Sequence, residues 1–541
     1  MTRAILTPQC RFILLVGLFI AGSGNLSLFQ RLLETNPPYP SNLPLLFSLV
    51  IFFSLVTILL FLLICHGRMT RWILAFFVIA SSQAAYYMDA YGVVIDVVMF
   101  DNILQTNLAE FAGLFSFGLA VRTLLLGLLP AWLIIRYCPG PLELRTEIKS
   151  KALLLSLITM LMILVVAPVY SGFKHFVRED KTTRKYANPG YFSYSLIKYS
   201  SSKIKSMRSF HLKQTAVDAI KMPGDKRRLG ILVVGEGARA DRFSLNGYAR
   251  DTNPELKKLG VLSFGNAISC GTSTGESVPC MFSVLNRTEF KREKAREMEN
   301  ALDVLQRTGV AVIWRDNNSD SKDVATRVRY EDYQSPALNP MCDRECRDVG
   351  MLEGLDRVIA GQKNSDVLIV LHQMGNHGPE YYRRYPEAFE RYVPVCTQSQ
   401  LKKCTREAVD NAYDNAILYT DFFLSRAIAL LKKHDAQFET MMLYVSDHGE
   451  SLGENGIYLH AAPYETAPIE QKHIPVVLWL GAQFGLDPAW GQSLKELPVS
   501  HDDLFCTLMT GYRIQTQACS AWENALRQKI QPRGSDFALE R

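Results

Sequence analysis

The chain has 541 residues, of which 48% are hydrophobic, and a formal net charge of +6. This length allows two domains, and the small charge without any nucleic-acid motif argues against a nucleic-acid-binding protein. Almost all long apolar runs lie before residue 173. The hydrophobic content therefore separates a membrane-type half from a globular half.

Five apolar runs in the first half are long enough to cross a bilayer, which takes about 20 mostly apolar residues. Further spans follow the first run closely, and it lacks a clear small-residue cleavage site, so we do not expect a cleaved signal peptide. The predicted spans are Phe12–Phe29, Leu43–Cys65, Trp72–Met88, Phe111–Ile135 and Ala152–Phe173. They predict a transmembrane domain over residues 1–173.

Basic residues predict the orientation of these spans. Lys and Arg gather before the first span, between the second and third, and between the fourth and fifth: Arg3, Arg11, Arg68, Arg71, Arg136, Arg145, Lys149 and Lys151. The alternate loops contain Arg31 and no other Lys or Arg. Because cytoplasmic loops carry the excess of Lys and Arg, the N-terminus should be cytoplasmic and everything after Phe173 exported.

The cysteines test this topology independently. Cys10, Cys65 and Cys138 fall at predicted cytoplasmic ends or loops, where thiols stay reduced, and the other eight lie in the exported half. An even number in an oxidising compartment predicts disulfides, with buried free thiols as the alternative. Their order suggests four short-range pairs: Cys270–Cys280, Cys342–Cys346, Cys396–Cys404 and Cys506–Cys519.

Two segments near the membrane remain open to interpretation. Asn102, Thr106 and Glu110 recur at four-residue spacing and would share one helical face at the outer membrane surface. That face could contact an amine-bearing headgroup, although the pattern alone favours a solvated interfacial helix. Residues 174–229 are rich in Lys, Arg, Ser and Tyr and should form a periplasmic linker, either solvated or held against anionic headgroups.

From Leu229 onwards, short apolar strands alternate with helical stretches. The expected strands are Leu232–Val234, Val310–Ile313, Val367–Leu371, Met441–Val445 and Val476–Leu480, and the clearest helices are Met298–Thr308 and Arg406–Lys433. This alternation predicts a parallel-type α/β sheet, covered on both faces, within residues 230–541. Ligands bind beyond the carboxyl ends of the strands in such sheets.

Polar residues follow the predicted strands at those ends. Carboxylate and imidazole groups, which are suitable zinc ligands, recur there: Glu236, Asp316, His372, His377, Asp447, His448, Glu450 and His460. Each of them alone could be structural. Their convergence at several strand ends predicts a metal site.

The segment Cys270–Cys280 supplies a reacting group for that metal. Thr272, Ser273 and Thr274 precede an expected helical turn, whose N-terminus offers free N–H groups and a positive dipole end. A hydroxyl bound to zinc there would ionise more easily and could act as a nucleophile. The pattern does not choose among the three, and without the metal residues a helix cap would be the better interpretation.

These motifs resemble the lipid A phosphoethanolamine transferases, including the mobile colistin-resistance enzymes, of the alkaline phosphatase and sulfatase superfamily. The resemblance covers nearly the whole chain and rests on Val234–Glu236, Asn246–Tyr248, Cys270–Ser283, Trp314–Lys322, His372–Pro379, Tyr413–Asn415 and Ser446–His460. It implies an N-terminal five-helix transmembrane domain and a C-terminal α/β alkaline phosphatase/sulfatase-like domain. It also implies a bacterial inner-membrane protein, expected to be monomeric, with its catalytic domain in the periplasm.

The resemblance assigns roles to individual residues. Thr274 matches the family nucleophile, and three further residues match the zinc ligands that complete the site with it: Glu236, Asp447 and His448. One Zn²⁺ should bind firmly, and a second remains an open alternative. His377 and His460 match histidines that contact the substrate phosphate or a second zinc.

Other matches concern the substrate. Asn318 and Lys322 match residues that handle the phosphoethanolamine group, and the face of Asn102, Thr106 and Glu110 matches one that lines the same cavity. Two positions depart from the family pattern without removing a ligand. Gly237 replaces the usual Thr and so lacks a supporting hydroxyl, and Ala461 replaces the usual Gly and restricts the turn after His460.

The implied reaction moves phosphoethanolamine from phosphatidylethanolamine to Thr274 and then to a lipid A phosphate, which would give polymyxin and colistin resistance. Alternatives are a relative acting on lipopolysaccharide core sugars or periplasmic glucans, a sulfatase-like hydrolase, and a non-catalytic membrane sensor. Sulfatases usually carry a modifiable Cys or Ser at the nucleophile position, so Thr274 argues against a sulfatase. The intact set of proposed ligands argues against a sensor.

Overall fold

The computed structural model describes residues 7–105, 114–140, 143–180, 182–206, 212–484 and 497–523. Residue contacts divide the chain into an N-terminal unit that extends to Lys203, apart from residues 105–109, and a C-terminal unit that begins at Ile204. Each unit has its own hydrophobic core. The two cores correspond to the membrane-type and globular halves expected from the sequence.

The described part of the N-terminal unit is helical. Its α-helices are α1 (Pro8–Ser23), α2 (Leu26–Thr35), α3 (Leu43–Ile64), α4 (Thr70–Tyr91), α5 (Val97–Gln105), α7 (Phe117–Arg122), α8 (Leu129–Tyr137), α9 (Leu144–Val166), α10 (Tyr170–Glu179) and α11 (Gly190–Ser206). A π-helical segment, Thr123–Leu128, joins α7 to α8. Apolar residues on several helices meet in one core cluster, which includes Ile13, Phe61 and Leu74.

Four helical stretches among the described residues are long and apolar enough to cross a membrane: Leu43–Ile64, Gly67–Tyr91, Phe117–Tyr137 and Leu144–Arg178. They contain or overlap the second to fifth predicted spans. The first predicted span corresponds to α1 and α2, which pass the same test together but are bent by 56° at the break between them. The unit therefore has four spanning helices, or five if the bent pair crosses as one span.

Polar side chains stabilise the break between α1 and α2. Asn25 Nδ2 donates hydrogen bonds to the carbonyl oxygens of Ala21 at 3.1 Å and Asn188 at 2.6 Å, and Asn25 Oδ1 accepts one from Asn188 N at 2.8 Å. Asn188 Nδ2 in turn donates to Ser81 O on α4 at 2.9 Å. Since a broken helix leaves backbone carbonyls without partners in an apolar environment, these amides allow the bend.

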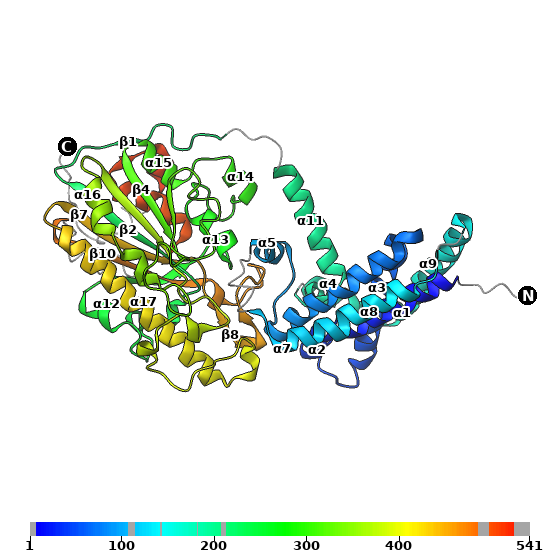
Figure 1. The fold of residues 1–541 in the computed structure, drawn as a ribbon. Helices are drawn as coiled ribbons and strands as arrows, with labels where there is room; N and C mark the ends of the chain where they lie inside the picture. The colour runs from blue at the N-terminus through cyan, green and yellow to red at the C-terminus, as the bar shows by residue number, and fades with distance from the viewer. Residues whose placement is uncertain are drawn as a thin grey trace, which may run out of the picture. The chain divides into compact units, whose positions relative to one another are not determined.

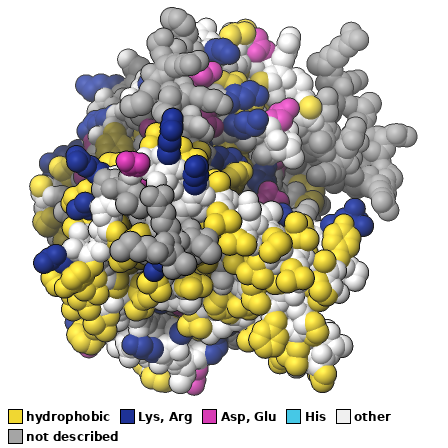
Figure 2. Space-filling model, turned by 90° about the vertical axis from the view of Figure 1, so that its right-hand side faces the viewer, with side chains coloured by type: hydrophobic (Ala, Val, Ile, Leu, Met, Phe, Trp, Pro, Cys, Tyr) yellow, Lys and Arg dark blue, Asp and Glu magenta, His cyan; other side chains and the backbone are white. Residues whose placement is uncertain are grey.

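The outward faces of the spanning helices are apolar. Large exposed hydrophobic side chains on α9 include Leu157, Met160, Leu161 and Leu164. On the face drawn in Figure 2, hydrophobic side chains gather in a broad area. Exposed apolar area on this scale is expected where lipid, rather than water, surrounds a protein.

The helices that follow the last span also pack in the N-terminal unit. Phe192 on α11 contacts Phe77 on α4 and Phe100 on α5, with ring centroids 6.4 and 5.3 Å apart. Tyr186, just before α11, donates a hydrogen bond to Gly92 O. Residues that the composition suggested as linker thus contribute to the packing of this unit.

The C-terminal unit is built on one eight-stranded sheet in the order β11-β3-β10-β7-β2-β6-β4-β5. Its strands are β2 (Arg227–Gly235), β3 (Leu262–Ile268), β4 (Val310–Asp316), β5 (Arg329–Asp332), β6 (Asp366–His372), β7 (Phe438–Ser446), β10 (His473–Leu480) and β11 (Val499–Ser500). Two small antiparallel pairs accompany it: β1 (Ile220–Lys221) with β12 (Ile514–Gln515), and β8 (Ser451–Leu452) with β9 (Tyr458–Leu459).

All five predicted strands are present, within β2, β4, β6, β7 and β10. The sheet is mixed rather than wholly parallel, because β10 runs antiparallel to both β3 and β7. β3 had not been predicted, since its sequence LSFGNAI lacks a continuous apolar run and its burial is uneven. Antiparallel strands within a largely parallel sheet are common in such folds.

Helices cover both faces of this sheet (Figure 1). On one face lie α12 (Pro254–Lys258), α16 (Leu355–Gly361) and α17 (Arg406–His434), and on the other lie α13 (Thr274–Met281), α15 (Ala301–Arg307) and α19 (Leu504–Gly511), with the short α14 (Arg292–Arg296) nearby. Successive residues of β2 alternate between the two cores, because neighbouring side chains on a strand point to opposite faces.

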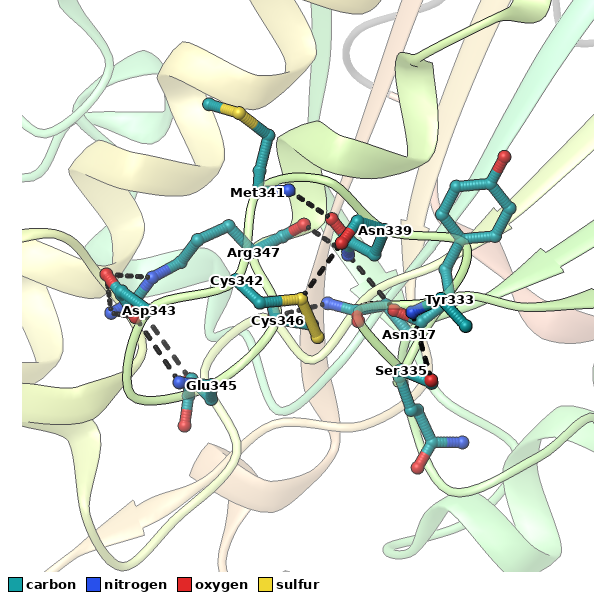
Figure 3. The surroundings of a disulfide bond; sticks show 12 residues. Asn317, Tyr333, Ser335, Asn339, Met341, Cys342, Asp343, Glu345, Cys346 and Arg347 are labelled. Carbon is teal, nitrogen blue, oxygen red and sulfur yellow. Dashed lines mark hydrogen bonds and ion pairs between the residues drawn. A yellow bond between two sulfur atoms is a disulfide. The ribbon is translucent and has the colours of Figure 1, made fainter.

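All four predicted disulfides form: Cys270–Cys280, Cys342–Cys346, Cys396–Cys404 and Cys506–Cys519. Cys10, Cys65 and Cys138 are free, as expected. Figure 3 shows the Cys342–Cys346 loop, where Arg347 pairs with Asp343. Asn317 Nδ2 donates to Cys346 O at 2.9 Å, so this loop supports the segment that follows β4 (Figure 3).

Candidate active site

The centre of the candidate site comes from two neighbouring parallel strands. β2 and β7 pair in register with Gly235 opposite Ser446. Glu236 follows the first of these residues directly, and Asp447 and His448 follow the second. The register of the two strands therefore places two carboxylates and an imidazole at the same edge of the sheet.

Thr274 lies between these groups. Its hydroxyl Oγ1 donates a hydrogen bond to Glu236 Oε2 at 2.9 Å and lies 3.5 Å from His448 Nε2. His448 Nε2 is 3.2 Å from Glu236 Oε1 and 3.4 Å from Asp447 Oδ2. All four side chains are buried. The structure thus brings together the nucleophile and the three ligands expected from the sequence.

Thr274 owes its position to the start of a helix. It is the first residue of α13, and the preceding Ser273 is extended, with φ −151° and ψ 152°. The N-terminus of a helix carries a partial positive charge, which favours negative charge on nearby groups. Thr274 is therefore placed where an ionised hydroxyl or a bound phosphoryl group is stabilised.

The orientation of the His448 ring leaves Nε2 available as a ligand atom. His448 Nδ1 lies 2.8 Å from Gly449 O, so Nδ1 carries the proton that it donates to this carbonyl. In the neutral ring, Nε2 then has a lone pair, and it faces both carboxylates. A backbone carbonyl bonded to the second ring nitrogen is typical of metal-ligating histidines.

Charge and hydrogen bonding indicate that a cation fits here. Glu236 Oε1 and Asp447 Oδ2 are buried and have no hydrogen-bond partner, which is costly for carboxylates. Burial, and then the Glu236 carboxylate, raise the pKa of Asp447 to about 6. Burial lowers the pKa of His448, but the Asp447 and Glu236 carboxylates outweigh it and raise that pKa to about 10. A divalent cation would satisfy both orphaned oxygens.

His460 lies against this cluster. One ligand atom each of Glu236, His448 and His460 lie within 4.8 Å of one another, and the rings of His448 and His460 have centroids 4.3 Å apart. His460 Nδ1 is 2.8 Å from Glu450 Oε2, and Glu450 Oε1 accepts a hydrogen bond from Tyr381 OH at 2.8 Å. The Glu450 carboxylate therefore orients the His460 ring and leaves Nε2 for the site.

His377 lies beyond His460, with ring centroids 5.7 Å apart. Burial lowers the pKa of His377 to about 3, despite the nearby Glu236 carboxylate. Its Nδ1 is buried without a hydrogen-bond partner. A neutral imidazole with an unpaired nitrogen is ready to bond a substrate oxygen or a cation.

Asn318 contacts Glu236 directly, whereas Lys322 reaches Asn318 through the Ser319 hydroxyl. Asn318 Nδ2 donates to Glu236 Oε2 at 2.9 Å and to Gln373 O at 2.7 Å. Lys322 Nζ donates to Ser319 Oγ at 2.7 Å, and this hydroxyl donates to Asn318 Oδ1 at 3.0 Å. The lysine is buried, so it places a positive charge one hydrogen-bonded residue behind Asn318.

The two departures from the family pattern both have positive φ. Gly237 has φ +61°, and its N–H donates to Asp447 Oδ1 at 3.1 Å. Ala461 has φ +66°, and its N–H donates to Thr272 O at 2.6 Å. Glycine suits the first position, whereas alanine is strained at the second.

The predicted membrane-proximal face is only partly described. Asn102 lies in α5 and is half-buried. Thr106 and Glu110 lie outside the described residues. The shared face of these three residues stays a prediction.

Sequence reasoning left two residues that support the site without a role. Glu450 was named among the polar residues after the predicted strands but received no individual role, and His501 had not been considered. Glu450 orients His460, and His501 bonds the backbones of Cys270 and Ser446. Glu450 could have been suspected as a carboxylate close to a predicted ligand, whereas the contacts of His501 join segments far apart in sequence.

Both units of the chain are similar to known proteins. A phosphoethanolamine transferase EptA/EptB family model matches residues 52–204, and a sulfatase family model matches residues 228–511. Phosphatidylethanolamine transferase Mcr-1 from Escherichia coli is 40% identical over 511 residues, which cover 91% of this chain and 93% of the relative. Phosphoethanolamine transferase EptA from Salmonella typhimurium is 36% identical, with 96% of each chain covered.

Solved structures agree with these matches. The integral membrane lipooligosaccharide phosphoethanolamine transferase A from Neisseria meningitidis matches with a TM-score of 0.90 at 32% identity, covering 94% of this chain and 96% of that one. The soluble domain of the Neisseria protein matches with a TM-score of 0.55 at 41% identity, covering 57% of this chain and 95% of that one. The similarity therefore extends over both units.

Proposed function

The chain belongs to the phosphoethanolamine transferase family, and we propose that it transfers phosphoethanolamine from phosphatidylethanolamine to a phosphate of lipid A through a phosphothreonine at Thr274. It is an inner-membrane protein with a periplasmic catalytic unit. The observation that carries the proposal is the position of Thr274 Oγ1, 2.9 Å from Glu236 Oε2 and 3.5 Å from His448 Nε2 at the start of a helix. We expect a monomer.

We assign a zinc ion to Glu236, Asp447, His448 and Thr274. When bound, zinc would supply a Lewis acid that favours ionisation of the Thr274 hydroxyl and neutralises charge on the transferred phosphoryl group. The two orphaned carboxylate oxygens and the free Nε2 of His448 support this assignment. Because His460 contributes a ligand atom to the same cluster, a second ion remains a testable extension.

In the first step Thr274 Oγ1 attacks the phosphorus of phosphatidylethanolamine. The Thr274 O–P bond forms, the P–O bond to diacylglycerol breaks, and Thr274 loses its proton. Glu236 Oε2, which already accepts the hydroxyl hydrogen bond, is the first group that can take this proton. The partial positive charge at the N-terminus of α13, where Thr274 lies, favours the negative charge that develops on phosphoryl oxygens.

The departing diacylglycerol oxygen requires a proton. His460 with both ring nitrogens protonated is suited to supply it from Nε2, because Glu450 binds Nδ1–H and holds Nε2 toward the cluster. In the second step a phosphate oxygen of lipid A attacks the phosphothreonine, the Thr274 O–P bond breaks, and Thr274 recovers the proton that Glu236 took in the first step. The same imidazole, deprotonated by the first step, can accept a proton from a monoanionic acceptor phosphate.

Donor and acceptor in this proposal are both lipids, which explains why a catalytic unit of this kind is joined to membrane-spanning helices. Two relatives support these substrates, since one is a phosphatidylethanolamine transferase and another is a lipooligosaccharide phosphoethanolamine transferase. We assign Asn318, backed by the Lys322 charge, to the phosphoryl part of the phosphoethanolamine group of the donor, supported by its contact with Glu236.

The direct test is incubation of the purified full chain with phosphatidylethanolamine labelled in its ethanolamine, followed by addition of lipid A. We expect a labelled protein adduct at Thr274 and then labelled lipid A, both detected by mass spectrometry. Release of free phosphoethanolamine without an adduct would instead support a sulfatase-like hydrolase. No turnover would support a membrane sensor. Transfer to core sugars or glucans with unmodified lipid A would show that these, rather than lipid A, are the acceptor.

The cellular consequence follows from surface charge. Phosphoethanolamine masks a lipid A phosphate and brings an ammonium group beside it, and each exposed charge pair is worth only about 1 kcal/mol. Polymyxins make several such contacts, so small losses multiply into a large loss of avidity. We expect expression of this chain in a susceptible Gram-negative host to raise polymyxin and colistin tolerance, and Thr274→Ala not to do so. Unmodified lipid A in cells with folded protein would contradict this acceptor.

A further inference from the structure

His501 is a buried histidine that the proposed reaction does not use. It directly follows β11, and only 1% of its surface is exposed. β11 runs parallel to β3, with Ser500 paired with Ile268. His501 is therefore carried to the beginning of the nucleophile turn, defined as residues 269–274.

Both ring nitrogens of His501 bond backbone atoms. Cys270 N–H donates to His501 Nδ1 at 3.0 Å, and His501 Nε2 lies 2.9 Å from Ser446 O. Because Nδ1 accepts a hydrogen bond, it carries no proton, and Nε2 must carry the proton that is donated to Ser446 O. The ring is thus fixed as the neutral Nε2–H tautomer, in agreement with burial, which lowers the pKa of His501 to about 4.

The two bonded backbone groups belong to the two segments that hold the reacting atoms. Cys270 lies in the turn that ends at Thr274, and Ser446 immediately precedes Asp447. Ser446 is itself fixed, since its Oγ accepts from Ala238 N and donates to His448 O, both at 2.9 Å. One rigid imidazole therefore connects the nucleophile turn to the ligand-bearing segment.

Other contacts of the turn do not make this connection. The Cys270–Cys280 disulfide joins the turn to α13, which is the same stretch of chain. Thr272 Oγ1 donates to Ala462 O at 2.6 Å and so joins the turn to the segment after His460. Among the described residues, His501 is the side chain whose hydrogen bonds join Cys270 to Ser446.

We propose that His501 is a positioning residue that sets the distance of Thr274 from Asp447 and His448 by clamping the Cys270 N–H to the Ser446 carbonyl. This inference rests on the proposed function for its kinetic effect. The structural effect of His501 is independent of the proposed function, because its two hydrogen bonds form whatever the substrate is. Loss of a group that positions catalytic residues or metal ligands typically changes metal affinity or activity by about 10- to 100-fold.

The test compares two substitutions of similar size in the full-length protein. His501→Gln keeps an acceptor and a donor that can reach Cys270 N and Ser446 O, whereas His501→Met keeps volume but neither group. We expect His501→Met to lower kcat for adduct formation about 10- to 100-fold with KM for phosphatidylethanolamine nearly unchanged. His501→Gln should recover most of that loss. A folded His501→Gln protein as slow as His501→Met would overturn the proposal, as would wild-type kcat in His501→Met.

Two further measurements separate positioning from general destabilisation. His434→Ala removes another histidine with a side-chain partner, Asp356, at the end of α17, and should leave kcat unchanged. Hydrogen exchange of the wild-type protein needs neither a variant nor a substrate. The Cys270 amide should exchange its hydrogen as slowly as the amides of the core. Rapid exchange at Cys270 in folded protein would contradict the clamp even if transfer itself were confirmed.

Discussion

The two halves of the candidate site are built in different ways. Glu236, Asp447 and His448 follow paired strands, whose ladder fixes their backbone positions. Thr274 instead begins α13 after an irregular turn, and His460 follows the short strand β9. Bonds between distant loops join these two segments, such as Ala461 N to Thr272 O at 2.6 Å. The strand half depends on sheet register, and the loop half depends on cross-links. Changes to the first should act through the metal, and changes to the second through geometry.

The largest effect is expected at the nucleophile. Thr274→Ala should lower transfer by at least about 10³-fold and abolish the protein adduct, since loss of a nucleophile removes the covalent route. Thr274→Ser keeps a hydroxyl at the same helix start and should retain measurable adduct formation. Both are measured by intact-protein mass spectrometry with labelled donor. Substantial transfer by Thr274→Ala would shift attention to Thr272 or Ser273.

The strand half can be tested by removing one buried charge. Asp447→Asn should abolish transfer and reduce bound zinc, measured by elemental analysis, because catalytic zinc has few protein ligands. In metal-free protein the same change should leave Tm equal or higher, since Asp447 Oδ2 is a buried carboxylate oxygen without a hydrogen-bond partner, close to Glu236. A large fall in metal-free Tm would show that Asp447 stabilises the fold rather than binding a cation.

The loop half can be tested with two disulfides of similar loop length. Replacing both cysteines of Cys270–Cys280 or of Cys396–Cys404 by Ser should each destabilise by about 3 kcal/mol in the chain-entropy model. Only the first pair brackets Thr274, so only its loss should also slow adduct formation, by about 10- to 100-fold. Thermal unfolding and adduct kinetics measure the two effects. Equal rates of adduct formation in the two variants would contradict the idea that the loop half depends on its cross-links for activity.

A smaller effect concerns the loop that carries His460. Glu454 accepts from Arg239 at 2.8 Å and Arg406 at 2.6 Å. Burial alone would raise the pKa of Glu454, but the Arg239 cation, helped by backbone hydrogen bonds, lowers it to about 2. A folded pKa below the unfolded value contributes stability above about pH 5 that is lost as pH falls toward 2. The Tm difference between wild type and Glu454→Gln should therefore shrink between pH 6 and pH 3.

The exposed Lys258–Glu255 pair on α12 provides the control for this pH series. Exposed pairs contribute little, so the Tm difference between wild type and Glu255→Gln should be small and nearly the same at every pH. A Glu454→Gln difference that stays constant or grows with acidity would contradict the assignment of the low pKa to Glu454.

The smallest effect is expected at Ala461. Its φ of +66° is unfavourable for alanine, so Ala461→Gly should stabilise the protein by about 0.5–1 kcal/mol. Gly260 has φ +65° with open space around its missing Cβ, so Gly260→Ala should destabilise by a similar amount. Chemical denaturation measures both. Destabilisation by Ala461→Gly would mean that the methyl group packs usefully against the site.

Much of this architecture was predictable because the relevant signals are local. The strand Leu232–Val234 and the following Glu236 could be read together, since an apolar run and the polar residue after it are adjacent in sequence. β3 was missed because LSFGNAI has neither alternation nor a continuous apolar run. The choice of Thr274 over Thr272 and Ser273 came from a family resemblance and stays a prediction, supported by the contact of Thr274 Oγ1 with Glu236.

By itself, the sequence determined the membrane-type half, five strands, the cysteine pairs and the residue types of a metal site. Apolar periodicity, basic loops and residue order carry these features, and all of them act over short stretches of chain. Only the tertiary structure decided the antiparallel direction of β10, the bend after α1, and the roles of Glu450 and His501. These features depend on hydrogen bonds between segments far apart in sequence, as between His501 and Cys270. Such segments come together only when the chain packs into its tertiary structure.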